Sequence, residues 1–136
     1  MTTRPFAKHI FQGRGGCPTS VDEQLDALRV LSPGWFDEAS PAFEGGALEW
    51  AAKLLRGLVD AFQLPNPYLY PTPEGNIRAE WSTPSWEVSL EMSPTSKRAD
   101  ALATRLDSDE VRGYPVATVE PGAESRLGKF LSEYLH

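Results

Sequence analysis

A helical repeat of apolar residues begins near residue 20. Ser20 and Glu23 have the spacing of a capping box, in which each side chain accepts the backbone N–H of the other residue. Apolar residues then recur at intervals of three or four until Pro33 and Gly34 interrupt the pattern. The spacing predicts a short helix whose core-facing residues are Val21, Leu25, Leu28 and Leu31.

A wider apolar stripe predicts a second, longer helix. Ser40 is suited to the N-cap and Pro41 to the first helical position. Pro65 and Pro67 end the pattern at its C-terminal end. The stripe consists of Leu48, Ala51, Ala52, Leu55, Leu58, Val59 and Phe62, and Trp50 and Leu54 widen it. So broad an apolar surface predicts that this helix contacts other elements on two sides.

After Pro67 the repeat changes to an alternation of two, the period of a β-strand. The segment "YLY" runs into the turn "PEGN", in which Gly75 can adopt a positive φ, and "IRAEWS" leaves it. In "WEVSLEM", Glu87, Ser89 and Glu91 share one side, opposite to Trp86, Val88, Leu90 and Met92. This alternation predicts antiparallel strands with one buried face and one face in solvent.

Residues 99–106 fit either a strand or a helix. Ala99, Leu102 and Leu106 have helical spacing, whereas a strand would continue the meander without a crossover. We favour the strand, with Leu102, Thr104 and Leu106 facing the core. In the next strand, "VRGYPVATV", Pro115 indicates an edge position or a bulge.

Together these elements predict an α+β fold. It comprises two N-terminal helices, an antiparallel meander of four to five strands, and a C-terminal helix that packs on one sheet face. The last helix follows "PGAES", and its apolar side consists of Leu127, Phe130, Leu131, Tyr134 and Leu135. A chain of 136 residues fits one domain. We therefore assign residues 21–136 to a single α+β domain and residues 1–20 to an irregular basic arm.

The charge is unevenly distributed and limits the choice of partners. The chain has a formal net charge of -6, with 13 Lys and Arg against 19 Asp and Glu. The arm contains Arg4, Lys8 and Arg14 and no acid, so ten basic and 19 acidic residues remain in the rest, a net charge of -9. An acidic body disfavours broad contact with nucleic acid or anionic membrane, because both are themselves negative.

The composition also bears on compartment and cofactors. Cys17 is the only cysteine, so an intramolecular disulfide cannot form. The first residues lack the apolar run of a signal peptide, and no segment approaches the length of a membrane span. We therefore expect a cytoplasmic protein without membrane contact. No motif predicts a cofactor, since the glycines of "QGRGGC" lack the flanking strand and helix of a nucleotide loop.

Part of the sequence resembles a group of small uncharacterised bacterial proteins. Those proteins share Gly-Trp, then a helix, then Pro-x-x-Tyr-Pro-Thr-x-Glu-Gly, then Glu-Trp. The residues that match are Gly34, Trp35, Pro67, Tyr70, Pro71, Thr72, Glu74, Gly75, Glu80 and Trp81. The resemblance covers residues from about Val21 onward. It implies an α+β layout and a bacterial origin, and it implies no established function and no catalytic residue.

The stretch "IRAEWSTPSWEVSLE" predicts a hairpin. A symmetric loop centred between Thr83 and Pro84 would place Trp81 opposite Trp86 and Glu80 opposite Glu87. The tryptophans share parity with Ile77, Ala79, Val88 and Leu90, which predicts that they face the core, toward the helix that carries Trp50. Like charges directly opposite each other are unfavourable, so the glutamates need an explanation.

Two hypotheses explain the glutamates on the outer side of the hairpin. In the first, arginines from the same and neighbouring strands compensate them on a solvated face, the candidates being Arg78, Arg105 and Arg112. In the alternative, Glu80, Glu87 and Glu91 hold a divalent cation in a small metal-dependent hydrolase. We favour compensation, because the spacing matches no known metal or hydrolase motif.

The favoured function is therefore that of a non-enzymatic interaction or regulatory protein, which binds a protein partner or forms a homodimer. Its candidate contact residues are Phe6, Phe11, Trp35 and Phe36. Cys17 and His9 lie eight residues apart in the arm with no third group to orient them, so we do not favour a nucleophile and base there. A further alternative is weak binding of single-stranded nucleic acid through the basic arm.

Overall fold

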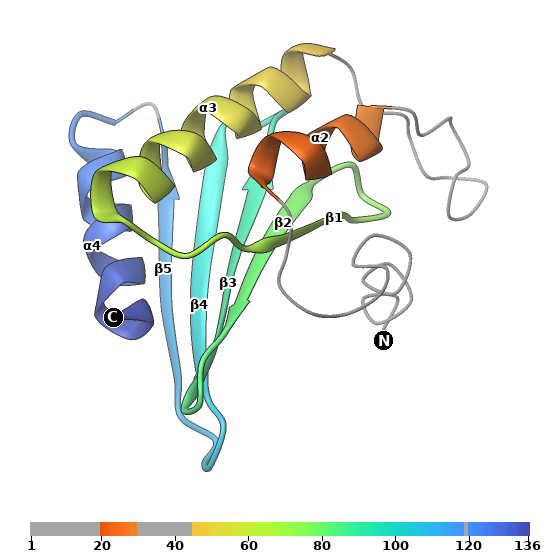
Figure 1. The fold of residues 1–136 in the computed structure, drawn as a ribbon. Helices are drawn as coiled ribbons and strands as arrows, with labels where there is room; N and C mark the ends of the chain where they lie inside the picture. The colour runs from red at the N-terminus through yellow and green to blue at the C-terminus, as the bar shows by residue number, and fades with distance from the viewer. Residues whose placement is uncertain (1–19, 30–44, 119) are drawn as a thin grey trace.

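A computed structural model describes residues 20–29, 45–118 and 120–136 and has the predicted α+β fold (Figure 1). Its helices are α2 (Val21–Arg29), α3 (Gly45–Phe62) and α4 (Ala123–Leu135). The strands are β1 (Tyr68–Pro71), β2 (Ile77–Ser82), β3 (Trp86–Ser93), β4 (Arg98–Arg105) and β5 (Val111–Ala117). The five strands form one antiparallel sheet in the order of the chain.

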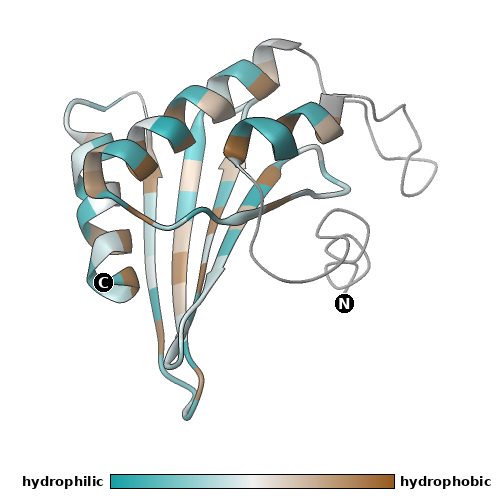
Figure 2. Ribbon diagram, viewed as in Figure 1, coloured by the Kyte–Doolittle hydropathy of each residue, from teal (hydrophilic) through white to brown (hydrophobic). Residues whose placement is uncertain are grey.

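The helices form a layer against the sheet. In Figure 1, α3 crosses one end of the strands with α2 beside it, and α4 runs alongside β5. The turns between β2 and β3 and between β4 and β5 extend beyond the helices at the other end of the sheet. Leucines of the helices and inward-facing residues of the strands form one buried cluster. Figure 2 shows hydrophobic and hydrophilic positions alternating along α2 and α3, as their amphipathic sequences predict.

The predicted capping box starts α2. The backbone N–H of Glu23 donates to Ser20 Oγ at 3.2 Å, and the N–H of Ser20 donates to Glu23 Oε1 at 3.3 Å. Val21, Leu25 and Leu28 are buried as expected. Leu31 and the predicted end of this helix lie outside the described residues, as do the proposed cap and first residue of the next helix, Ser40 and Pro41.

Both tryptophans of the central hairpin face the helical layer, as their parity predicted. Trp81 is 3% exposed, and its indole Nε1 donates to the carbonyl oxygen of Pro65 at 2.7 Å. Trp86 packs against Tyr134 of α4, with ring centroids 4.7 Å apart. The tryptophans therefore contribute to packing between the layers.

The predicted pairing of the hairpin was wrong by two residues. Trp81 lies opposite Val88 and Glu80 opposite Ser89, so neither the two tryptophans nor the two glutamates are partners. The turn closes between Thr83 and Trp86, where the N–H of Thr83 donates to the carbonyl of Trp86 at 2.9 Å. This places Pro84 at the second turn position, which its fixed φ favours, whereas the expected loop placed it third.

Residues 98–105 form a strand as favoured, but its expected inward face was wrong. Ala99, Ala101 and Ala103 are at most 2% exposed and face the core, whereas Leu102 is 38% exposed. The pairing with β3 decides this, because each of the three alanines lies opposite an inward residue: Met92, Leu90 and Val88. Leu106 follows the strand and is 52% exposed. Pro115 lies in β5, an edge strand, as predicted.

Candidate functional site

The sheet has a second face, opposite to the helical layer, which we call the outer face. Side chains alternate along each strand, so the residues between the core positions lie on this face. Its members on β1 to β3 are Tyr68, Tyr70, Arg78, Glu80, Ser82, Glu87, Ser89, Glu91 and Ser93. Its members on β4 and β5 are Arg98, Asp100, Leu102, Thr104, Val111, Gly113, Pro115 and Ala117.

An ion-pair network on β2 and β3 explains two of the three candidate glutamates. Arg78 Nη1 lies 3.0 Å from Glu91 Oε1, and Arg78 Nε lies 3.6 Å from Glu80 Oε2. The Asn76 side-chain amide donates to the second oxygen of Glu91 at 2.8 Å. Because Glu80 is only 5% exposed, its carboxylate depends on neighbours of this kind rather than on water. Compensation by Arg78 is therefore present in the structure.

The third glutamate is separate from this network. Glu87 is exposed and accepts a hydrogen bond from Ser82 Oγ at 2.8 Å, its partner across the hairpin. The geometry does not bring Glu80, Glu87 and Glu91 together as a metal site. Over residues 20–29, 45–118 and 120–136, no three His, Cys, Asp or Glu side chains are grouped so that they could hold a metal ion.

A hollow of about 340 Å³ lies on the outer face between the polar and the apolar strands. Its lining is mostly polar and comes from three adjacent strands. The lining residues are Arg78 and Glu80 of β2, Glu87, Val88 and Ser89 of β3, and Leu102 and Thr104 of β4. The hollow was not predicted from the sequence, because it depends on which residues of β2, β3 and β4 are neighbours.

Beyond the hollow, the outer face of β4 and β5 carries exposed apolar side chains, with the exposed Asp100 beside them. Leu102 is 38% exposed and Val111 is 53% exposed. Since Val111 lies opposite Thr104 and Leu102 lies opposite Gly113, the two large side chains are diagonal neighbours on adjacent strands. Gly113 and Pro115 are also exposed. We call Leu102, Val111, Gly113 and Pro115 the outer apolar patch.

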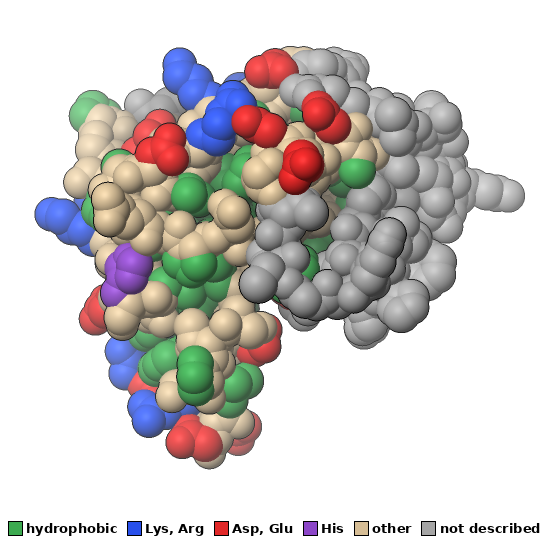
Figure 3. Space-filling model, viewed as in Figure 1, with side chains coloured by type: hydrophobic (Ala, Val, Ile, Leu, Met, Phe, Trp, Pro, Cys, Tyr) green, Lys and Arg blue, Asp and Glu red, His purple; other side chains and the backbone are tan. Residues whose placement is uncertain are grey.

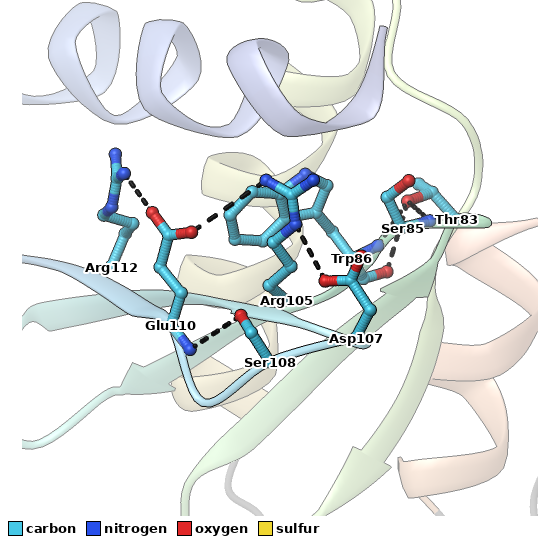
Figure 4. Close-up of polar contacts among 8 residues, drawn as sticks. All are labelled: Thr83, Ser85, Trp86, Arg105, Asp107, Ser108, Glu110 and Arg112. Atoms are coloured by element: carbon cyan, nitrogen blue, oxygen red, sulfur yellow. Dashed lines mark hydrogen bonds and ion pairs between the residues drawn. The ribbon is translucent and has the colours of Figure 1, made fainter.

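The end of the sheet carries a cluster of charges around an aromatic ring (Figure 4). The Arg105 guanidinium lies over the Trp86 ring, 5.5 Å from its centroid. It also pairs with Asp107 at 3.0 Å, and Glu110 pairs with Arg112. Glu110 raises the pKa of the Arg112 guanidinium above its ordinary value by a hydrogen bond and by its charge.

This cluster corrects an expectation about the arginines. Arg105 and Arg112 lie on the side of the sheet that Trp86 occupies, so they do not compensate the outer-face glutamates. Most of the paired groups are at least one-third exposed, and exposed ion pairs contribute only about 0 to 1 kcal/mol each. The short spacing of Arg105, Asp107 and Glu110 in the sequence was the only signal of the cluster.

The candidate contact residues from the sequence cannot be placed. Phe6, Phe11, Trp35 and Phe36 lie outside the described residues, and so do His9 and Cys17. In Figure 3, acidic and basic side chains are interspersed over the described part of the visible face. Among the described residues, no helix has both the length and the apolar character needed to cross a membrane.

No family model matches this chain, and neither the curated proteins nor the solved structures include a significant match to it.

Proposed function

We propose that this chain is a non-enzymatic interaction protein that acts by binding another protein, either a different chain or a second copy of itself. The observation that carries the proposal is the outer apolar patch. Leu102 and Val111 are large apolar side chains, 38% and 53% exposed, on a sheet face opposite to the helices. Contiguous exposed apolar side chains with a polar rim are characteristic of protein-binding surfaces.

The surroundings of the patch support the same class of function. The acid-lined hollow lies directly beside it, because Leu102 belongs to the patch and also lines the hollow. The carboxylates near that border already have protein partners, since Arg78 pairs with Glu91 and Ser82 donates to Glu87. Such groups favour selection of a complementary partner more than they favour chemistry on a substrate. As part of this proposal, we infer that the protein resides in a bacterial cytoplasm. Its single cysteine is compatible with a reducing compartment, and the resemblance described above implies a bacterial origin.

Photo-crosslinking in the source cell tests the patch directly. With benzoylphenylalanine in place of Val111, irradiation is expected to attach a discrete protein to the chain. The same crosslinker at Lys53, exposed on α3, is the matched control and is expected to attach none.

Substitution of the patch supplies the second measurement. The double variant Leu102→Ser, Val111→Thr is expected to lose the partner, while its free energy of unfolding changes little because both side chains are substantially exposed. The native mass shows whether the partner is lost, and thermal melting shows whether the stability of the chain has changed. A wild-type chain that stays monomeric and gives no adduct at Val111 contradicts the proposal.

A further inference from the structure

The outer face of β4 and β5 is suited to contact with another flat surface. The outward positions of β5 include Val111, Gly113 and Pro115, which are exposed and have short side chains. Among the described residues, the exposed large apolar side chains are Leu102, Leu106 and Val111, and all three belong to the hairpin of β4 and β5. Two sheets pack face to face when such side chains interdigitate at a spacing of about 10 Å. This face therefore has the character of a surface that another sheet can cover.

Two exposed charges of opposite sign lie on the same face. Arg98 and Asp100 occupy successive outward positions of β4. Asp100 lies opposite Glu91 of β3, and like charges in that arrangement repel each other. The nearby guanidinium of Arg78 pairs with Glu91 and Glu80. Among the residues that the structure describes, neither Arg98 nor Asp100 takes part in an ion pair. The face therefore presents one cation and one anion that a partner can pair.

We propose that the partner of the outer apolar patch is a second copy of the same chain, so that two outer faces pack together about a twofold axis. In such a contact, residue i of one copy meets residue j of the other, and j meets i. Arg98 of each copy pairs with Asp100 of the other, and two ion pairs form at once. A surface that carries both charges complements itself, whereas a different partner would have to supply the reversed pattern. This inference rests on the proposed function and specifies its partner.

The contact uses the face of β5 rather than its edge. Pro115 has no N–H to donate to a further strand, so pairing between two β5 edges is disfavoured. On the outer face, Pro115 lies opposite Asp100 and adds apolar surface beside the proposed ion pairs. The same residue thus disfavours pairing at the edge and contributes to packing at the face.

Charge reversal in the purified full-length chain tests the inference, with sedimentation equilibrium as the measure of dimerisation. The wild-type chain is expected to form a dimer. Arg98→Glu and Asp100→Arg, each made alone, are expected to weaken dimerisation about tenfold, because each reversal changes both ion pairs of the symmetric contact. Lys129→Glu, exposed on α4, is the matched control and should dimerise as wild type does. Thermal melts verify that the variants are folded.

Mixing the two variants distinguishes this contact from any other. An equimolar mixture of Arg98→Glu and Asp100→Arg is expected to recover dimerisation of about wild-type strength. The reason is that one chain then supplies only acids at the two positions and the other supplies only arginines, so every pair across the contact joins opposite charges. A change confined to the single chain would give no such recovery.

Three results would each overturn the inference. These are a purified wild-type chain that stays monomeric at all concentrations, a dimer that neither reversal weakens, and a mixture that dimerises no better than its components. The crosslinker at Val111 separates this failure from that of the proposed function. A different protein attached there in the cell, with a monomeric purified chain, refutes the second copy and leaves the proposed function intact.

Discussion

Gln24 shows how one polar side chain can join two layers of a fold. Its side-chain Nε2 donates to the carbonyl oxygen of Pro67 at 2.8 Å, and its Oε1 accepts the backbone N–H of Leu69 at 2.7 Å. The residue is 7% exposed, so water is largely excluded from these bonds. Because one amide satisfies both a donor and an acceptor of the edge strand, it fixes the position of α2 along β1.

The substitution Gln24→Ala is therefore expected to destabilise the fold. It leaves the N–H of Leu69 and the carbonyl of Pro67 without these partners, which should lower the free energy of unfolding by about 2 to 4 kcal/mol. Urea denaturation followed by tryptophan fluorescence measures the change. Lys53→Ala, exposed on α3, is the control and should stay within about 0.5 kcal/mol of wild type. Equal stability of the two variants would show that the amide is dispensable.

At the scale of elements, α4 approaches α3 closely at a glycine. A Cβ atom at Gly128 would lie 2.0 Å from Cε2 of Phe62 and 2.2 Å from its Cδ2. Glycine in the middle of a helix is unfavourable by about 1 kcal/mol relative to alanine. Its presence in α4 is explained by the contact, since any side chain there would displace the Phe62 ring and separate the two helices.

Gly128→Ala is accordingly expected to destabilise the protein by about 1 to 3 kcal/mol, despite the better helix propensity of alanine. Gly57→Ala in α3 is the matched control, because a Cβ there meets only an oxygen of Glu124 at 3.5 Å and should be neutral or stabilising. Thermal melting of both variants measures the difference. If Gly128→Ala is as stable as Gly57→Ala, the ring of Phe62 moves aside without penalty.

At the scale of the whole molecule, β5 forms one edge of the sheet. The N–H of Arg105 donates to Glu110, and the N–H of Thr118 donates to Lys97. Antiparallel pairs alternate, so residues 111, 113, 115 and 117 direct their backbone groups away from β4. Pro115 stands in this outward row and has no N–H to donate. It thereby interrupts the edge that another strand would need for pairing.

Pro115→Thr is expected to increase self-association by restoring an outward N–H on this edge. Sedimentation at increasing protein concentration should show more dimer or larger species than wild type. Pro121→Thr, exposed before α4 and outside the sheet, is the control and should sediment as wild type does. An unchanged distribution for Pro115→Thr would mean that other features already protect the edge.

The sequence by itself determined the elements and much of their orientation. The capping box of Ser20 and Glu23, the turn at Gly75 with its φ of 92°, and the inward parity of Trp81 all followed from local rules. They did so because each depends on residues a few positions apart. The edge position of β5 was also predictable, because Pro115 cannot contribute to a ladder on both sides.

Only the tertiary structure decided which residues become neighbours across strands. In the structure the hairpin pairs two residues away from the expected register, which separates Glu80 from Glu87. Pairing with β3 then directed the alanines of β4 inward and Leu102 outward, against the hydrophobicity of the single residues. The hollow and the outer apolar patch both arise from that pairing, which side-chain alternation within one strand cannot specify.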